Sequence, residues 1–222
     1  MDDTWWNVHP ARPRIQYRQH DDRDRRTIAQ HLLDNRIIYL GYPIVPEVTE
    51  WVIGALLFLQ ADKKEQDVHL YINSLGGYVD QTLAIYDTMT FLSCDVATYC
   101  IGTAASGAAL LLCAGTPGKR FALPNSKMML HQPVGGVGGQ AEDVRIQADE
   151  ILKDKKRLVA ILSKHTGQDE KKIASETERD HYMDAHEAKE YGLVDEILEH
   201  EPKGKKEKGA GKNADKGKPS DK

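Results

Sequence analysis

The stretch from Gly102 to Gly115 constrains the fold of this chain more than any other. It combines very small residues, one serine at Ser106 and an apolar run from Ala108 to Ala114. Small residues let one backbone pass close to another or to a ligand, and the apolar run predicts a buried helix that begins near Ser106. Because the first N–H groups of a helix are unpaired and positively polarised, Ser106 is either the N-cap of this helix or a nucleophile beside an oxyanion site.

The rest of the chain alternates β-forming segments with segments of helical periodicity, which predicts an α/β fold. The expected strands are residues 36–40, 68–72, 95–101, 119–122, 127–131 and 193–198, and the expected helices are residues 27–35, 48–61, 78–92, 108–114, 141–165, 169–177 and 184–191. The turns at Gly76-Gly77 and at Ser106 each lead from a strand directly into a helix. Two such turns in succession predict repeated ββα or βα units with functional groups at the strand ends.

The helix expected over residues 141–165 is long and polar, and its apolar positions are sparse. A helix with so narrow an apolar stripe often projects from the body of a domain and packs against another subunit. The glycine-rich segment of residues 135–139 predicts a flexible loop immediately before it.

The two ends of the chain differ from the domain expected over residues 27–200. Residues 201–222 contain eight lysines against four acidic residues and no large apolar side chain, so we expect a disordered Lys/Gly-rich tail. Residues 1–26 are polar and predict a mobile arm, in which Trp5 and Trp6 are candidates for docking against a partner. The chain has a net charge of −4 and the tail carries +4, so residues 1–200 carry −8, which argues against nucleic acid as the partner.

Cysteine usage and hydropathy predict a cytoplasmic protein without membrane contact. Cys94, Cys100 and Cys113 lie in apolar segments and form no CxxC pair, as expected of buried, reduced thiols. No apolar run approaches the ~20 residues that a membrane span needs. The first residues show neither the basic nor the apolar region of a secretory signal.

A serine nucleophile needs a base, and the base needs a group that orients it. His131 is the best candidate base because it ends an expected strand just before Gln132-Pro133, although a lone histidine is often structural. Asp180 lies between an expected helix and a short strand, where an aspartate is either the orienting acid or a cap. The Gly76-Gly77 turn can offer a backbone N–H to an oxyanion, but such turns are common.

Three patterns that suggest other chemistries fail on context. Residues 136–141 fit the loose dinucleotide pattern GxGxxA, but no nucleotide-binding half precedes them. Residues 115–119 lack the spacing and the Ser/Thr of a phosphate-binding loop. His186-Glu187 has no second histidine four residues on, which a zinc peptidase of that class requires. The sequence therefore predicts neither a cofactor nor a metal.

From about residue 35 to residue 198 the chain closely resembles the proteolytic subunits of Clp proteases (ClpP), serine peptidases of the crotonase-like fold. The matching motifs are LYINSLGG at residues 70–77, AIYDTM at 84–89, IGTAAS at 101–106, GKRF at 118–121, LPNS at 123–126, LHQP at 130–133, TERD at 177–180 and EYGLVD at 190–195. The resemblance implies a fold of repeated ββα units with a projecting handle helix.

The resemblance also implies roles for individual residues. Ser106 falls on the nucleophile, His131 on the general base and Asp180 on the acid that orients it. The backbone N–H groups of Gly77 and Gly107 fall on the oxyanion hole. Such subunits look like parts of a sequestered chamber that cleaves unfolded polypeptides.

Further positions fall on the family's assembly and docking surfaces. Residues 132–168 match the handle that interlocks two seven-membered rings into a barrel of fourteen subunits, made of this chain or of this chain and a paralogue. Arg179 falls on a position that senses ring-to-ring contact through an ion pair. His69, Tyr71 and Phe91 resemble the pocket that docks a hexameric AAA+ unfoldase, which uses the ATP.

The chain departs from the family pattern at Leu75, usually a proline, and at Gly107, usually a methionine. The extra backbone freedom of Gly107 is expected to weaken the preorganisation of an oxyanion hole. Residues 36–50 look more like the ClpR paralogues, which generally lack the complete triad. A ClpR-like structural or regulatory ring subunit is therefore an alternative, and an acyl-CoA hydratase or isomerase on the same fold is a third interpretation.

Overall fold

The structure, a computed structural model, describes residues 27–200. The predicted arm over residues 1–26, with Trp5 and Trp6, and the predicted tail over residues 201–222 lie outside the described residues. The helices are α1 (Ile28–Asp34), α2 (Pro46–Asp62), α3 (Val79–Phe91), α4 (Gly107–Cys113), α5 (Ala141–Thr166), α6 (Glu170–Glu176) and α7 (Ala185–Tyr191). The strands are β1 (Ile37–Leu40), β2 (Val68–Ser74), β3 (Val96–Ala105), β4 (Arg120–Ala122), β5 (Lys127–Leu130), β6 (His181–Asp184) and β7 (Glu196–Ile197), which confirms the predicted α/β fold.

One branched sheet organises the domain. Its main path runs β1-β2-β3-β4-β7, and all the pairs along it are parallel. β3 is long enough to hold two neighbours on the same edge, because Thr98–Cys100 pair with β4 and Thr103–Ala105 pair with β5. β5 in turn pairs antiparallel with β6. The carboxyl ends of β3 and β5 therefore lie beside each other.

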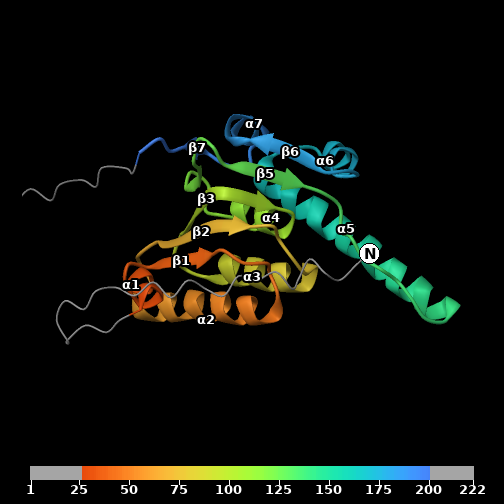
Figure 1. Ribbon diagram of the computed structural model, residues 1–222, viewed down its shortest axis with the longest axis horizontal. Coiled ribbons are helices and arrows are strands. Elements are labelled where there is room, and N and C mark those ends of the chain that lie inside the picture. Colours follow the sequence, from red (N-terminus) through yellow and green to blue (C-terminus); the bar gives the residue numbers. More distant parts are fainter. Residues whose placement is uncertain (1–26, 201–222) are drawn as a thin grey trace, which may run out of the picture.

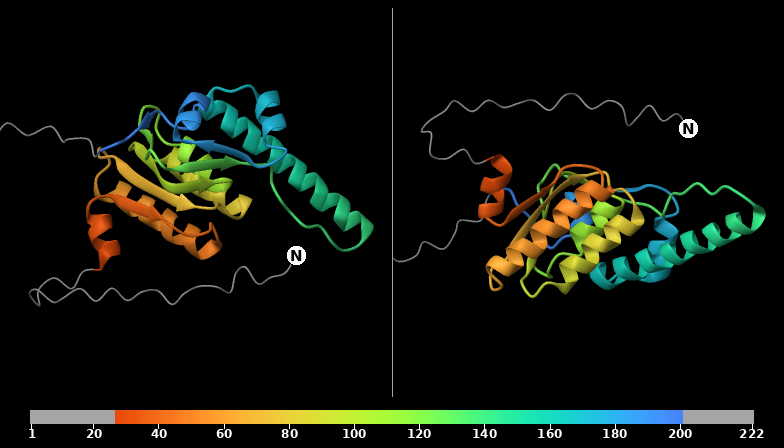
Figure 2. Two further views of the ribbon diagram at one scale, coloured as in Figure 1. Left: turned by 45° about the horizontal axis from the view of Figure 1, so that its top comes forward. Right: turned by 90° about the horizontal axis from the view of Figure 1, so that it is seen from below.

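Helices α2, α3 and α4 lie side by side under one face of the sheet (Figures 1 and 2). Ala108 to Cys113 of α4 are all buried, which explains why this helix consists of small and aliphatic residues only. Leu111 and Leu112 pack into one core cluster with the apolar side chains of β2 and β3. Burial of each such leucine stabilises the fold by about 1.5–3 kcal/mol.

The strand predicted to begin at Arg36 begins at Ile37 instead. The reason is that Arg36 caps the end of α2, a contact that sequence patterns do not show. Arg36 has a positive φ of 60° and reverses the chain between α1 and β1. Its guanidinium is buried and donates to carbonyl oxygens at and after the end of α2, those of Leu59, Lys63, Gln66 and Asp67. Carbonyls at a helix C-terminus lack helical partners and carry partial negative charge. Arg36 therefore stabilises the end of α2 instead of extending β1.

Other strand boundaries also differ from the prediction. The third strand continues to Ala105, since the addition of β5 provides partners beyond Ile101. The last strand is only Glu196–Ile197, because Leu193 and Val194 fill the core from a turn instead of from the sheet.

The long helix α5 projects from the body of the domain, as predicted (Figure 1). Only Val159 and Leu162, near its C-terminal end, are buried, whereas Ile146 and Leu152 are about half exposed. Its anchored end packs against α4 and α6. The helix thus contributes to the core at one end and leaves apolar side chains uncovered at the other.

Candidate active site

Two strand-to-helix turns pack against each other at the carboxyl ends of β2 and β3. Gly76 has φ +85°, and a Cβ on it would lie 2.6 Å from the carbonyl oxygen of Ala105 and 2.9 Å from the amide nitrogen of Gly107. A Cβ on Gly77 would lie 2.2 Å from the carbonyl oxygen of Ile44. Glycine is therefore required at both positions, by the backbone conformation at Gly76 and by the close approach of other backbone at both.

Ser106 occupies the sharp turn from β3 into α4 in a strained conformation. Its φ is 55° and its ψ is −124°, a region that residues with a Cβ rarely adopt and that recurs at functional sites. Its N–H donates to the carbonyl of Met129 at 2.8 Å, which fixes the turn to β5. Its hydroxyl caps no N–H of α4. Ser106 is thus placed where an N-cap would be, but its side chain does not act as one.

The pairing of β5 with β6 brings His131 and Asp180 together. Leu130 is the register partner of His181, so the residues just outside this pair, His131 and Asp180, lie opposite each other. The N–H of Gln132 donates to the carbonyl of Thr177 at 2.7 Å and extends the contact. His131 Nδ1 lies 3.5 Å from Asp180 Oδ1. This distance is at the upper limit for a hydrogen bond.

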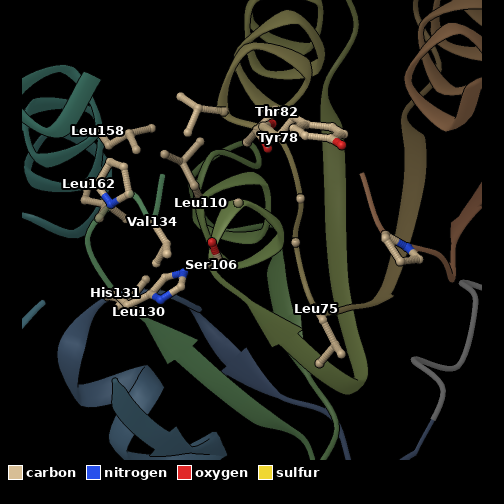
Figure 3. A pocket seen from close by; sticks show the side chains of 16 residues that line it. Leu75, Tyr78, Thr82, Ser106, Leu110, Leu130, His131, Val134, Leu158 and Leu162 are labelled. Atoms are coloured by element: carbon tan, nitrogen blue, oxygen red, sulfur yellow. Dashed lines mark hydrogen bonds between the residues drawn. The ribbon is translucent and has the colours of Figure 1, made fainter. Parts of the chain in front are cut away.

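Ser106 and His131 open into one pocket of about 590 Å³ between α3, α4 and the anchored part of α5. Figure 3 shows the Ser106 hydroxyl and the His131 ring facing the same space from the ends of β3 and β5. No hydrogen bond joins the two side chains in the described structure. The apolar wall consists of Val79, Leu110, Leu130, Pro133, Val134, Leu158 and Leu162. An apolar side chain of a substrate would fit this space beside the hydroxyl.

The N–H groups of Gly77 and Gly107 flank the Ser106 turn. Gly107 is the first residue of α4, so its N–H has no partner within the helix. Within residues 27–200 neither N–H donates a hydrogen bond to another protein group. Both glycines line the pocket into which Ser106 opens. These two donors are therefore free for an oxygen of a ligand.

The cysteines confirm the prediction of buried, unpaired thiols. Cys94, Cys100 and Cys113 are all free and buried. Burial raises the pKa of the Cys100 thiol to about 11 and that of Cys113 to about 12. Because the thiolate is the reactive form of cysteine, neither thiol is a candidate nucleophile.

Arg179 is exposed and lines a shallow depression together with His131 and Asp180. It makes no ion pair with another described residue of this chain. Arg179 is next to Asp180 in sequence and lies at the rim of the site, exposed to solvent.

The residues expected to dock an unfoldase only partly come together. Tyr71 stacks on Tyr99, which stacks on Phe121, with ring centroids 4.4 Å and 5.0 Å apart. His69 Nδ1 lies 3.0 Å from the Tyr99 hydroxyl, and burial lowers the pKa of His69. Tyr71, Tyr99 and Phe121 line a shallow pocket on the strands, but Phe91 is at the end of α3 and does not line it. Within one chain, therefore, Phe91 is separate from the other two.

Sequence patterns did not single out several residues that shape the pocket. Leu110, Leu158 and Leu162 are part of the ordinary helical apolar pattern, and only the packing of α4 against α5 shows that they line a cavity. Thr82 is a buried polar residue within α3 and also lines the pocket. A buried threonine at a helical position carries no local signal of function.

Residues 27–200 offer neither a metal site nor a membrane-spanning helix. This part of the chain contains no group of three or more His, Cys, Asp or Glu side chains arranged to hold a metal ion. None of its helices is both long enough and apolar enough to cross a membrane.

Comparison with known proteins shows the family of the chain. The sequence model of the family described as Clp protease matches residues 20–201. One similar protein is the ATP-dependent Clp protease proteolytic subunit 1 of Rhodopirellula baltica, which is 50% identical over 182 residues, or 82% of this chain and 80% of the relative. Because the family model matches most of the chain and this relative is 50% identical to it, this chain belongs to the Clp protease family.

Proposed function

We propose that this chain is a serine endopeptidase in which Ser106, His131 and Asp180 form the catalytic triad. The observation that carries the proposal is the placement of the strained Ser106 and of His131 at one pocket, with Asp180 beside the far nitrogen of the histidine ring. Nδ1 faces Asp180, which leaves Nε2 to accept the serine proton. The uncapped hydroxyl of Ser106 supports the same assignment.

The reaction follows from these positions. His131 Nε2 takes the hydroxyl proton while Ser106 Oγ bonds to the carbonyl carbon of a peptide, which forms a tetrahedral intermediate. The N–H groups of Gly77 and Gly107 bind the resulting oxyanion. When the C–N bond breaks, the leaving amine takes the proton from His131 and the acyl group stays on Ser106. Water, deprotonated by His131, then releases the acyl group and restores the serine.

The pocket indicates which peptides fit. Its wall is mostly apolar, so an apolar residue before the cleaved bond gains burial there. Leu75 and Tyr78 are exposed beside the glycine turn, where they would contact an extended polypeptide. We infer that the substrates are unfolded polypeptides, because a folded chain cannot place its backbone between these elements.

The projecting helix and the exposed apolar side chains support assembly. Ile146 and Leu152 on α5, and Val134 and Val137 before it, are exposed in the single chain. A second copy or a paralogue would cover them, as two seven-membered rings stacked through the handle would do. Arg179 beside Asp180 would then couple ring contact to the triad. The shallow pocket at Tyr71 would receive an AAA+ unfoldase, and His69 adds a polar group next to Tyr99, which lines this pocket.

The test is hydrolysis of short peptides with an apolar residue before a fluorogenic leaving group, by the purified full chain, with the assembly size measured in the same sample. We expect activity in the assembled wild type and none in Ser106→Ala. Activity that appears only with a paralogue and survives Ser106→Ala would contradict the proposal and would identify a ClpR-like subunit. Purified wild type that assembles but never cleaves would also contradict it.

A further inference from the structure

Thr82 is a buried threonine on the face of α3 that meets α4. Its exposed fraction is 1%. Its hydroxyl donates to the carbonyl oxygen of Tyr78 at 3.0 Å, and its own N–H donates to the same oxygen at 2.9 Å. Burial and this hydrogen bond restrict the side chain to one rotamer. Thr82 therefore presents a fixed surface to whatever packs on it.

The residue that packs on it is Gly107. A Cβ on Gly107 would lie only 2.3 Å from Thr82 Oγ1 and 3.0 Å from its Cγ2. Such distances are far inside van der Waals contact, so the threonine side chain occupies the space that any side chain at position 107 would need. Thr82 and Gly107 are thus complementary in shape, although 25 residues separate them in sequence.

Gly107 is enclosed on a second side by Gly76. A Cβ on Gly76 would lie 2.9 Å from the amide nitrogen of Gly107. The peptide unit of Gly107 is therefore held between the β2–α3 turn and the Thr82 side chain. This enclosure removes the backbone freedom that the sequence alone suggests for a glycine at this position.

We propose that Thr82 is a positioning residue for the oxyanion-binding N–H of Gly107. The proposal rests on the proposed function, in which that N–H binds the developing negative charge. A donor helps only if it already points at the oxyanion when the charge forms, and Thr82 supplies the contact that holds it there. Thr82 touches no reacting atom itself, so its effect appears in the rate of the chemical step and not in substrate affinity.

Two substitutions at Thr82 distinguish the effect of the side chain's shape from the effect of its hydroxyl. Thr82→Ala empties the space beside Gly107, and we expect kcat for peptide hydrolysis to fall about tenfold with KM changed less than about twofold, since small misplacements of catalytic groups cost rate. Thr82→Val keeps the shape but loses the hydroxyl, and we expect kcat within about threefold of wild type. The matched control is Thr88→Ala on the same helix, which removes the same type of hydroxyl-to-carbonyl bond and should leave kcat unchanged.

A double substitution tests the contact directly. Gly107→Ala alone collides with Thr82, and we expect its reaction rate with a fluorophosphonate to fall by about a hundredfold, as on loss of an oxyanion donor. In the Thr82→Ala/Gly107→Ala double variant the collision is relieved, and we expect a rate at least about tenfold above that of Gly107→Ala. Melting temperatures and assembly sizes of all variants are measured in parallel, so that a loss of folding or assembly is distinguished from a loss of reaction rate.

The outcomes distinguish the two proposals. A wild-type chain whose Ser106 does not react overturns the proposed function and this inference with it. A reactive wild type with equal kcat in Thr82→Ala, or with additive effects in the double variant, overturns this inference alone. A fall in kcat in Thr88→Ala as large as that in Thr82→Ala would also overturn it, because the effect would then be one of helix stability.

Discussion

Replacing Ser106 with glycine is expected to stabilise the protein while it removes the proposed nucleophile. Ser106 adopts φ 55° and ψ −124°, a conformation in which the Cβ collides with the backbone. The hydroxyl caps no N–H of α4, so its loss leaves no helix N–H without a partner. The substitution therefore removes a strain and breaks no capping hydrogen bond.

The size of the effect follows from two opposing terms. A residue with a Cβ that is held in this region of φ and ψ destabilises the folded state by on the order of 1–3 kcal/mol. Glycine at the same place gives the unfolded chain more conformational freedom, which destabilises the fold by about 0.5–1 kcal/mol. The difference predicts that S106G is more stable than S106A by about 1 kcal/mol, or a few degrees in melting temperature.

The assay is thermal or denaturant unfolding of S106G and S106A, compared at the same protein concentration and assembly size. Ser175 provides a matched control because it is an exposed residue in the ordinary helix α6. There we expect the opposite order, with Ser175→Gly less stable than Ser175→Ala by about 0.8–1 kcal/mol. If S106G proves no more stable than S106A while the Ser175 pair behaves normally, the strain argument at the proposed nucleophile is wrong.

Three further predictions test the frame of the site. Arg36→Met should destabilise the domain by about 2–4 kcal/mol in denaturant unfolding, because it leaves the carbonyls at and after the end of α2 without their donor. Burial raises the pKa of Asp195, but its hydrogen bonds with Arg120 outweigh this effect and hold the pKa below its usual value; the resulting stability is present above the unfolded pKa and is lost as pH falls through the folded one. Asp195→Asn should therefore flatten the acid side of a plot of stability against pH, and an unchanged slope would contradict the pairing. Leu162→Ala should shift peptide preference toward larger apolar residues before the cleaved bond, measured as the ratio of kcat/KM for two such peptides, whereas an unchanged ratio would show that Leu162 does not shape the proposed subsite.

Much of the fold could be predicted from the sequence because local pattern and tertiary structure agree. The glycine pair at Gly76-Gly77 and the run of small residues after Ser106 each mark a strand-to-helix turn, and both turns occur where expected. The projection of α5 followed from its sparse apolar positions. In each case the feature depends on residues that are close in sequence.

What the sequence could not predict depends on contacts between distant residues. The boundary of β1 is set by Arg36 and the end of α2, about thirty residues away. The proximity of His131 and Asp180, which the family resemblance implied but no local pattern did, depends on the antiparallel register of β5 and β6. Thr82 fills the space beside Gly107 only because α3 and α4 pack together. No periodicity or spacing records such pairs.

The central claim is that a hydroxyl, an imidazole and a carboxylate from three separate turns act together on one peptide bond. Reaction of the assembled chain with a fluorophosphonate, followed by mass spectrometry of its peptides, tests the claim most directly. The account predicts a single modified residue, Ser106, and a labelling rate that falls at least about a thousandfold in His131→Ala. Absence of label at Ser106, or labelling of Ser106 at the same rate in His131→Ala, would contradict it.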